Sequence, residues 1–362
     1  MPIDIQNKVF DLLCIGTESE CEYTKLPTGA GNRIYIRAQR KSAVPESGGP
    51  ATLGRIDASD KKLKSIVVVY GPDAAENKTF CAIAEHIVAK HNELVPEILY
   101  KSANQHWYIV SDCGDTNLLE LILKTQENTE TEACQKLLFK AVDSLVQFQT
   151  LCQDWDFSQS YPMQSFDGNE ITNYFRKFEH RLLLNLGVNF SELELETVLS
   201  GLIDTVRHIP AHLCGPIHRD YQARNILVQP DYTLRIIDFQ ALRHGPLIYD
   251  VLSLLGQSSV QYGPELQNRV IDYFTQSSGL STQELYGHIP VIRLIRNLQS
   301  LGSYGVAGIE NGQEYFLNAI PKTLEKALIQ CAENEHSGLY MSPLIRALEQ
   351  SLHQFKLRYT VH

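Results

Sequence analysis

His218-Arg219-Asp220-Tyr221-Gln222-Ala223-Arg224-Asn225 places a carboxylate and a side-chain amide five residues apart. A second carboxylate, Asp238, follows Asn225 by 13 residues. Residues 225–228 and 234–237 are rich in β-branched and leucine residues and flank the turn Gln229-Pro230-Asp231-Tyr232, which predicts a β-hairpin. The hairpin delivers Asn225 at the entry of one strand and Asp238 at the exit of the next, so the sequence predicts a rigid, oxygen-rich site.

The spacing His-Arg-Asp-x-x-x-x-Asn is that of the catalytic loop of kinases. Phosphoryl transfer needs a carboxylate that holds the acceptor hydroxyl and takes its proton. It also needs oxygen ligands that hold Mg²⁺ against the phosphates. A chance match is the alternative, and the predicted hairpin between the two carboxylates argues against it.

Around this loop the chain resembles the aminoglycoside phosphotransferase and choline kinase group, which shares the protein-kinase fold. Ile237-Asp238-Phe239-Gln240 stands where protein kinases have Asp-Phe-Gly, and Gly245-Pro246-Leu247-Ile248-Tyr249-Asp250 follows shortly after. Within the group it looks most similar to the bacterial kinases that phosphorylate the anomeric hydroxyl of N-acetylmuramate or N-acetylglucosamine. Three further segments fit that subgroup: 26–35, 95–99 and 296–304.

The resemblance implies an α+β, protein-kinase-like bilobal fold and the use of ATP and Mg²⁺. It implies that Asp220 is the catalytic base and that Asn225 and Asp238 are the Mg²⁺ ligands. It also makes Asp250 a buried carboxylate that braces the catalytic loop through His218 or Arg219. A helix N-terminal cap is the alternative role for Asp250.

Hydrophobic periodicity divides the chain into a β-rich N-terminal lobe at 1–110, a hinge at 111–117 and a helical C-terminal lobe at 118–362. The first lobe is predicted to hold an amphipathic helix over residues 1–20, strands at 33–38, 66–70 and 107–110, and a helix at 77–92. Helices of the second lobe are predicted at 118–124, 132–151, 170–186 and 191–208. Residues 41–62 are polar and rich in Gly, Pro and Ser, which predicts a mobile loop.

Two segments of the N-terminal half are candidates for binding ATP. The resemblance makes Gly29-Ala30-Gly31 the turn over the phosphates, where glycine lets backbone N–H groups approach oxygens; a plain hairpin turn is the alternative. Asn32 and Arg33 can add side-chain donors, although Arg33 can equally be a solvated strand residue. The hinge Ser111-Asp112-Cys113 is expected to bond adenine through its backbone, with a plain linker as the alternative.

One expected residue is missing. Kinases place a lysine on the third strand and pair it with a glutamate on the next helix, but residues 65–70 contain no lysine. The candidates for its role are Lys64, Lys78, Arg33 and the helix N-terminus at Asn77. Glu85 in the predicted helix and Glu76 just before it are the candidate acidic partners.

The acceptor pocket is expected in the helical lobe near the catalytic loop. Sugars are held by carboxylates, amides and aromatic faces, and an arginine suits a lactyl carboxylate through paired N–H donors. Surface or interlobe contacts are the alternative role for each candidate. The candidates are Asp167, Tyr174, Arg176, Gln222, Arg224 and Arg296.

Composition narrows the class of protein. The net charge is −10 and no Lys/Arg-rich block occurs, which argues against nucleic-acid binding. We find no apolar run of membrane-spanning length and no secretion signal. The eight cysteines are scattered without a Cys-x-x-Cys pair, which predicts free thiols in a reducing cytoplasm. The expected partner is a small-molecule substrate with a hydroxyl group, and the oligomeric state is left open.

Three alternatives to an amino-sugar kinase stay open. The acceptor can be an aminoglycoside, choline or another amino alcohol. The absent strand lysine favours a nucleotide-binding pseudokinase without turnover, whereas the complete set Asp220, Asn225 and Asp238 argues against it. A transfer of AMP instead of a phosphoryl group is the third alternative.

Overall fold

The computed structural model describes residues 1–27, 32–41, 63–91, 93–125 and 131–359. Gly29 and Gly31, predicted in the phosphate turn, and the predicted loop after Lys41 lie outside these residues. The chain forms two compact units, each built from two segments: 1–162 with 220–242, and 163–219 with 243–362. This division differs from the lobes at 1–110 and 118–362, which stay a prediction.

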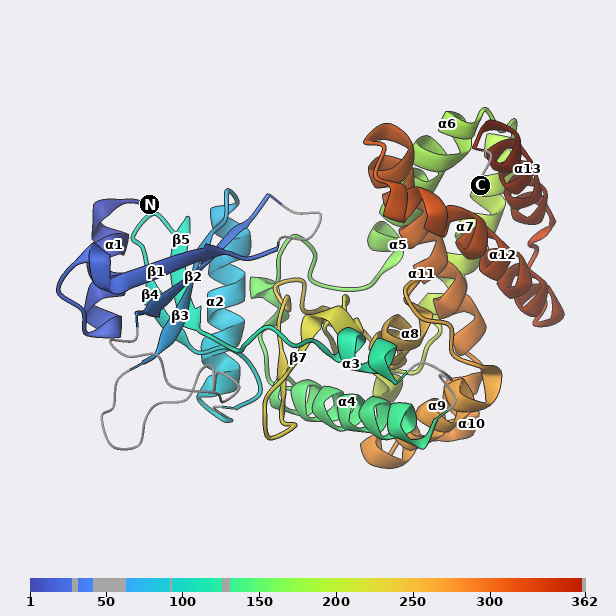
Figure 1. The fold of residues 1–362 in the computed structure, drawn as a ribbon. Coiled ribbons are helices and arrows are strands. Elements are labelled where there is room, and N and C mark those ends of the chain that lie inside the picture. The colour runs from blue at the N-terminus through green and yellow to red at the C-terminus, as the bar shows by residue number, and fades with distance from the viewer. Residues whose placement is uncertain (28–31, 42–62, 92, 126–130, 360–362) are drawn as a thin grey trace. The chain divides into compact units, whose positions relative to one another are not determined.

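The first unit contains a five-stranded antiparallel sheet in the order β1-β2-β3-β5-β4. In Figure 1, helix α1 lies on one side of this sheet and α2 on the other. The three strands predicted at 33–38, 66–70 and 107–110 are confirmed as β2, β3 and β5. The strands are β1 (Cys21–Lys25), β2 (Ile34–Arg40), β3 (Ser65–Tyr70), β4 (Ile98–Lys101) and β5 (Trp107–Ser111).

Helix α1 (Ile3–Leu13) buries one apolar stripe against the sheet, as its periodicity predicted. Ile5, Val9 and Leu13 join a core that also includes Ile66 and Val68 of β3. The helix ends where Cys14 adopts φ +53°, so it is shorter than the predicted segment. Because Ile66 and Val68 of β3 face α1, the alternate side chains Val67 and Val69 point to the other face of the sheet.

Helix α2 (Ala74–Val88) begins three residues earlier than the predicted helix at 77–92. Asp73 caps it by accepting the backbone N–H groups of Ala75 and Glu76. Asn77 is buried and its Nδ2 donates to the Gly71 carbonyl at 2.8 Å. Glu76 therefore lies in the first turn of the helix and not before it.

The rest of the first unit holds helices α3 (Leu118–Lys124) and α4 (Glu132–Leu151), both with the predicted bounds, and the predicted hairpin β7 (Ile226–Val228) and β8 (Leu234–Ile236). The hairpin is fixed at both strands. Val228 N donates to Thr116 O, and Ile236 N donates to Leu94 O, each at 2.8 Å. Tyr221, just before the hairpin, is fully buried and donates to Ala141 O of α4.

The second unit is mainly helical, and within it α11 packs against α5, α8 and α12. It also contains a two-stranded sheet that the sequence did not predict, β6 (Cys214–Ile217) with β9 (Arg243–Pro246). None of the described helices is long and apolar enough to cross a membrane. The helices are α5 (Gly168–Phe178), α6 (Leu184–Leu186), α7 (Glu192–Arg207), α8 (Ile248–Gly256), α9 (Pro264–Ser278), α10 (Thr282–Tyr286), α11 (Ile289–Tyr304), α12 (Glu314–His336) and α13 (Ser342–Arg358).

Candidate active site

The segment from Asp220 to Asn225 folds back on itself. Gln222 N and Asn225 Nδ2 both donate to the Asp220 carbonyl at 2.9 Å, and Asn225 N donates to Gln222 O at 2.8 Å. The Asp220 carboxylate accepts from Gln222 Nε2, and Arg224 Nη2 lies 3.8 Å from its Oδ2. About a third of the Asp220 side chain is exposed. The loop therefore holds a carboxylate in a fixed position with access to solvent.

The hairpin brings the second carboxylate to the same end of the loop. Ile237 N donates to Asn225 O at 3.0 Å, so Asp238 is the next residue after a backbone bond to Asn225. Asp238 adopts φ +65°, an uncommon conformation for a non-glycine residue, and its Oδ1 accepts from Gln240 Nε2 at 2.9 Å. An amide oxygen and a carboxylate are hard donors, so Asn225 and Asp238 fit a Mg²⁺ ion.

Aromatic packing anchors the turn after Asp238. Phe239 is fully buried and stacks on Phe80 of α2, with ring centroids 4.6 Å apart and planes within 11°. Arg33, just before β2, reaches the same turn, with its Nη1 3.9 Å from Asp238 Oδ1. Asn32, beside Arg33, is exposed.

The segment predicted as the hinge forms an ion pair with β2. The carboxylate of Asp112 accepts two bonds from Arg37, at 2.6 and 2.9 Å, and is buried. The carbonyl of Cys113 accepts from Gln229 Nε2 at 2.7 Å, and Ser111 Oγ accepts from Glu97 N. The Asp112 side chain is thus committed to the fold, and only backbone groups of this segment are candidates for adenine.

In the second unit, Asp250 holds the residues just before the loop. Its carboxylate accepts the backbone N–H of His218 at 2.7 Å and of Arg219 at 2.9 Å. Asp250 is fully buried within the first turn of α8, whose N-cap position is Leu247. Burial raises the pKa of Asp250 to about 6, although the charge of His218 and the two backbone donors oppose the shift.

Arg219 belongs to a buried cluster that the sequence did not reveal. Its Nε donates to Tyr174 Oη at 2.8 Å and lies 3.2 Å from Glu170 Oε1. Arg243 Nη1 lies 2.5 Å from the same oxygen, and Tyr174 Oη also donates to Glu170. Glu170 and Arg243 are 73 residues apart and no local motif marks them. Burial raises the pKa of Tyr174 well above its usual value.

The remaining substrate candidates already have partners within their own unit. Asp167 is the N-cap of α5 and accepts from Asn169 N and Glu170 N. Arg176 pairs with Glu179 at 2.7 Å and with Glu196. Arg296 Nη1 donates to Leu252 O at 2.7 Å and its guanidinium lies 5.3 Å from the ring centre of Tyr249. These residues and Tyr174 belong to the second unit, whereas Gln222 and Arg224 belong to the first.

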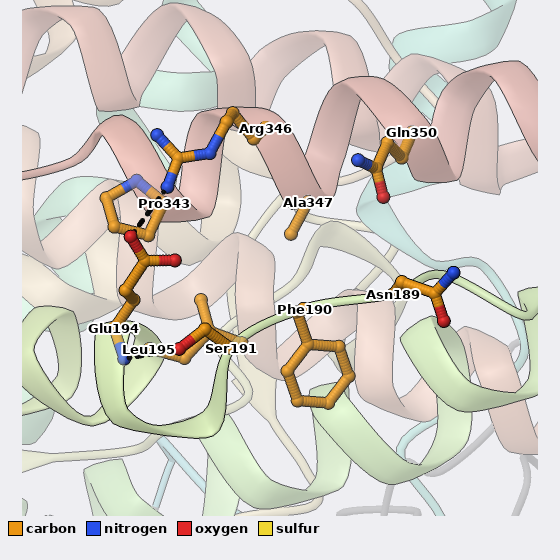
Figure 2. A pocket seen from close by; sticks show the side chains of 9 residues that line it. All are labelled: Asn189, Phe190, Ser191, Glu194, Leu195, Pro343, Arg346, Ala347 and Gln350. Atoms are coloured by element: carbon orange, nitrogen blue, oxygen red, sulfur yellow. Dashed lines mark hydrogen bonds and ion pairs between the residues drawn. The ribbon is translucent and has the colours of Figure 1, made fainter.

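The described residues of the second unit line cavities at two places. One, of about 300 Å³, is bordered by the segment 189–195 and helix α13, with Arg346 paired to Glu194 at 3.0 Å (Figure 2). None of the predicted site residues lines it. The other, of about 310 Å³, lies among α8, α9, α11 and α12 and includes Arg296. The oxygen-rich loop at 220–225, which holds the predicted catalytic residues, is the candidate active site.

Comparison with known proteins gives a consistent picture. Residues 59–288 match the model of a phosphotransferase enzyme family. An N-acetylmuramate/N-acetylglucosamine kinase of Neisseria meningitidis is 25% identical over 243 residues, 64% of this chain and 68% of the relative. A protein of the same name from Pseudomonas aeruginosa is 24% identical over 301 residues, 79% of this chain and 84% of the relative.

A solved structure supports the same assignment at the level of the fold. An aminoglycoside phosphotransferase in ternary complex with streptomycin and ATP superposes with a TM-score of 0.55 at 14% identity. The alignment covers 87% of this chain and 98% of the other.

Proposed function

The chain belongs to the phosphotransferase enzyme family, whose model matches more than half of it, and it is a phosphotransferase that acts on a hydroxyl group. Its α+β, protein-kinase-like fold is confirmed. From this premise we propose that it transfers the γ-phosphoryl group of ATP, with Mg²⁺, to a hydroxyl of an amino sugar of the N-acetylmuramate or N-acetylglucosamine type.

One observation carries the proposal: a single loop and hairpin hold Asp220, Asn225 and Asp238 together. The backbone bond from Ile237 to Asn225 and the side-chain bond from Asn225 to Asp220 O fix the three residues at one end of the hairpin. Positioning of this kind is most of what phosphoryl transfer asks of a protein.

In the proposed reaction Asp220 orients the acceptor hydroxyl and takes its proton. The acceptor oxygen forms a bond to the γ-phosphorus while the bond from that phosphorus to the β–γ bridging oxygen breaks, and ADP leaves. Mg²⁺, held by Asn225 and Asp238, would neutralise the charge that develops on the phosphates. An anomeric hydroxyl is more acidic than an ordinary alcohol, so it asks less of Asp220.

Nucleotide binding is proposed at two segments. Backbone groups of Ser111, Asp112 and Cys113 would bond adenine, since the Asp112 carboxylate is taken up by Arg37. The turn with Gly29 and Gly31, followed by Asn32, would meet the phosphates. The structure of a family member with ATP bound supports the use of this nucleotide.

The names of the two curated relatives support an amino-sugar acceptor. We propose that its binding residues come from the predicted set. Aromatic rings suit the apolar face of a sugar, and arginines offer paired donors to a carboxylate. The proposed residues are Asp167, Tyr174, Arg176, Gln222, Arg224 and Arg296.

The test is ADP release by the purified protein with MgATP against N-acetylmuramate, N-acetylglucosamine, glucosamine, kanamycin and choline. Turnover is expected with an N-acetyl sugar, with the product identified by phosphorus NMR as an anomeric phosphate. Asp220→Asn keeps the shape of the side chain but loses the base, so kcat should fall about 10²–10⁴-fold.

Three distinct outcomes would contradict the proposal. Turnover with kanamycin or choline alone would replace the amino sugar with another acceptor. ATP binding without turnover on any acceptor would indicate a pseudokinase. A protein adduct with the mass of AMP would replace phosphoryl transfer altogether.

A further inference from the structure

Strand β3 carries no positive charge. Its sequence, Ser65-Ile66-Val67-Val68-Val69-Tyr70, offers no group that could bind phosphate oxygens from the middle of the sheet. Lys64 precedes the strand and is exposed, and Lys78 lies on the exposed face of α2. A phosphotransferase that binds ATP needs a cation beside the phosphates, so this charge must come from another position.

Arg33 is a buried cation close to the proposed metal ligand Asp238. Its side chain is only 9% exposed, and it directly precedes β2. Nη2 lies 3.3 Å from Glu76 Oε2 and Nη1 lies 3.9 Å from Asp238 Oδ1. The guanidinium carbon is 6.0 Å from the ring centre of Phe80. The guanidinium of Arg33 therefore lies between Glu76 and Phe80 of α2 and the Asp238 carboxylate.

The register of the sheet places Arg33 on the side where a β3 lysine would act. Tyr35 pairs with Val69, and Ile36 with Val68. Because side chains alternate along a strand, Arg33 shares a face with Tyr35 and Val69, opposite the face of Val68 that packs with α1. Tyr108 of β5, which pairs with Val69, meets Phe80 of α2 on this same face.

An arginine within β2, Arg37, provides an internal comparison. Arg37 makes three short bonds, at 2.5 to 2.9 Å, to Asp112 and Asp115. In Arg33, by contrast, Nε and Nη2 are sealed from solvent and have no hydrogen-bond partner among the described residues, and both ion pairs are long. A buried guanidinium stays charged and is costly to leave without hydrogen bonds. Arg37 is saturated by the fold, whereas Arg33 retains capacity for a ligand.

We propose that Arg33, oriented by Glu76, supplies the positive charge that binds the α- and β-phosphates of ATP in place of a lysine on β3. This inference rests on the proposed use of ATP and adds the residue that positions it. Arg33 binds phosphate oxygens through its planar fork of N–H donors. When Asp238 binds Mg²⁺, the long contact from Arg33 to Asp238 gives way to the phosphate.

The test compares ATP, ADP and adenosine binding by calorimetry in the presence of Mg²⁺. Arg33→Met should weaken ATP and ADP about 10- to 100-fold and leave adenosine unchanged, because adenosine has no phosphate. Arg33→Lys keeps the positive charge but has fewer N–H donors, so it should lose less affinity for ATP and ADP than Arg33→Met. Arg40→Met, at an exposed position of β2, removes an equal charge and should bind all three ligands as the wild type does.

Two results would overturn the inference. One is equal ATP affinity in Arg33→Met and Arg40→Met. The other is an equal loss of affinity for ATP and for adenosine in both Arg33 variants, which would show that Arg33 stabilises the fold and does not bind phosphate. The denaturation midpoints of both variants are measured alongside. A wild-type protein that binds no ATP would refute the proposed function itself, so the two failures are told apart.

Discussion

Asp250 is a carboxylate whose charge works against the stability of the fold. It is fully buried, and its two hydrogen bonds to backbone N–H groups compensate only part of the desolvation, so its pKa rises to about 6. The folded protein therefore holds a proton on Asp250 more tightly than the unfolded chain does. Its contribution to the free energy of unfolding is largest below about pH 4 and is lost as the pH rises through about 6.

This sign gives a measurable pH dependence. Asp250→Asn cannot titrate, so the free energy of unfolding of the wild type should fall relative to the variant by roughly 2 kcal/mol between pH 4.5 and 7. Denaturant unfolding of both proteins at the two pH values measures the difference. A difference that does not change with pH, or that rises, would contradict the raised pKa.

Site residues that belong to a sequence motif could be predicted from the sequence. Residues that come together only through tertiary packing could not. Asp220, Asn225 and Asp238 stand at a recognisable spacing. Glu170 and Arg243 carry no such signal, because their contact depends on how α5 and β9 pack. Side-chain packing of this kind is set by tertiary structure, and one sequence does not reveal it.

At the scale of elements, the ion pairs between β2 and the segment after β5 are all made by the guanidinium of Arg37, which pairs with Asp112 and Asp115. Arg37→Met would leave the buried Asp112 carboxylate without its partner, which should lower the free energy of unfolding by about 3–5 kcal/mol. Asp115→Asn should cost less than about 1 kcal/mol, because Asp115 is 60% exposed. Denaturant unfolding measures both, with Arg40→Met as the exposed control. Similar losses in all three variants would show that the pair does not stabilise the sheet.

Elements with strong local signals were predicted well. Helices α3 and α4 have clear apolar periodicity and a side-chain cap, at Asn117 and Thr131. Strand β6, Cys214-Gly215-Pro216-Ile217, contains a glycine and a proline and no alternation. It becomes a strand because Ile217 and Cys214 pair with Arg243 and Pro246, a partner strand well separated in sequence. Such pairing is nonlocal, and for that reason the sequence did not predict it.

At the scale of the molecule, all eight cysteines are free thiols, as predicted. Only Cys14 is exposed and Cys214 is half-buried. Burial raises the pKa of Cys81, Cys113, Cys152 and Cys331 to about 12, which suppresses the reactive thiolate. The native protein should therefore show one fast-reacting thiol with Ellman's reagent, absent in Cys14→Ser, and eight thiols in denaturant. Fewer than eight in denaturant without reductant would indicate a disulfide.

The two units are interleaved along the chain, and one of their boundaries falls between Arg219 and Asp220, inside the motif. Neither unit corresponds to a single continuous stretch of the gene. A chimera of this protein and a relative, made by a single crossover in the gene, would build one unit from segments of both parents. Recombination libraries that respect the fold need paired breakpoints, so that 220–242 travels with 1–162. The hairpin β7–β8 is thereby inherited together with the five-stranded sheet.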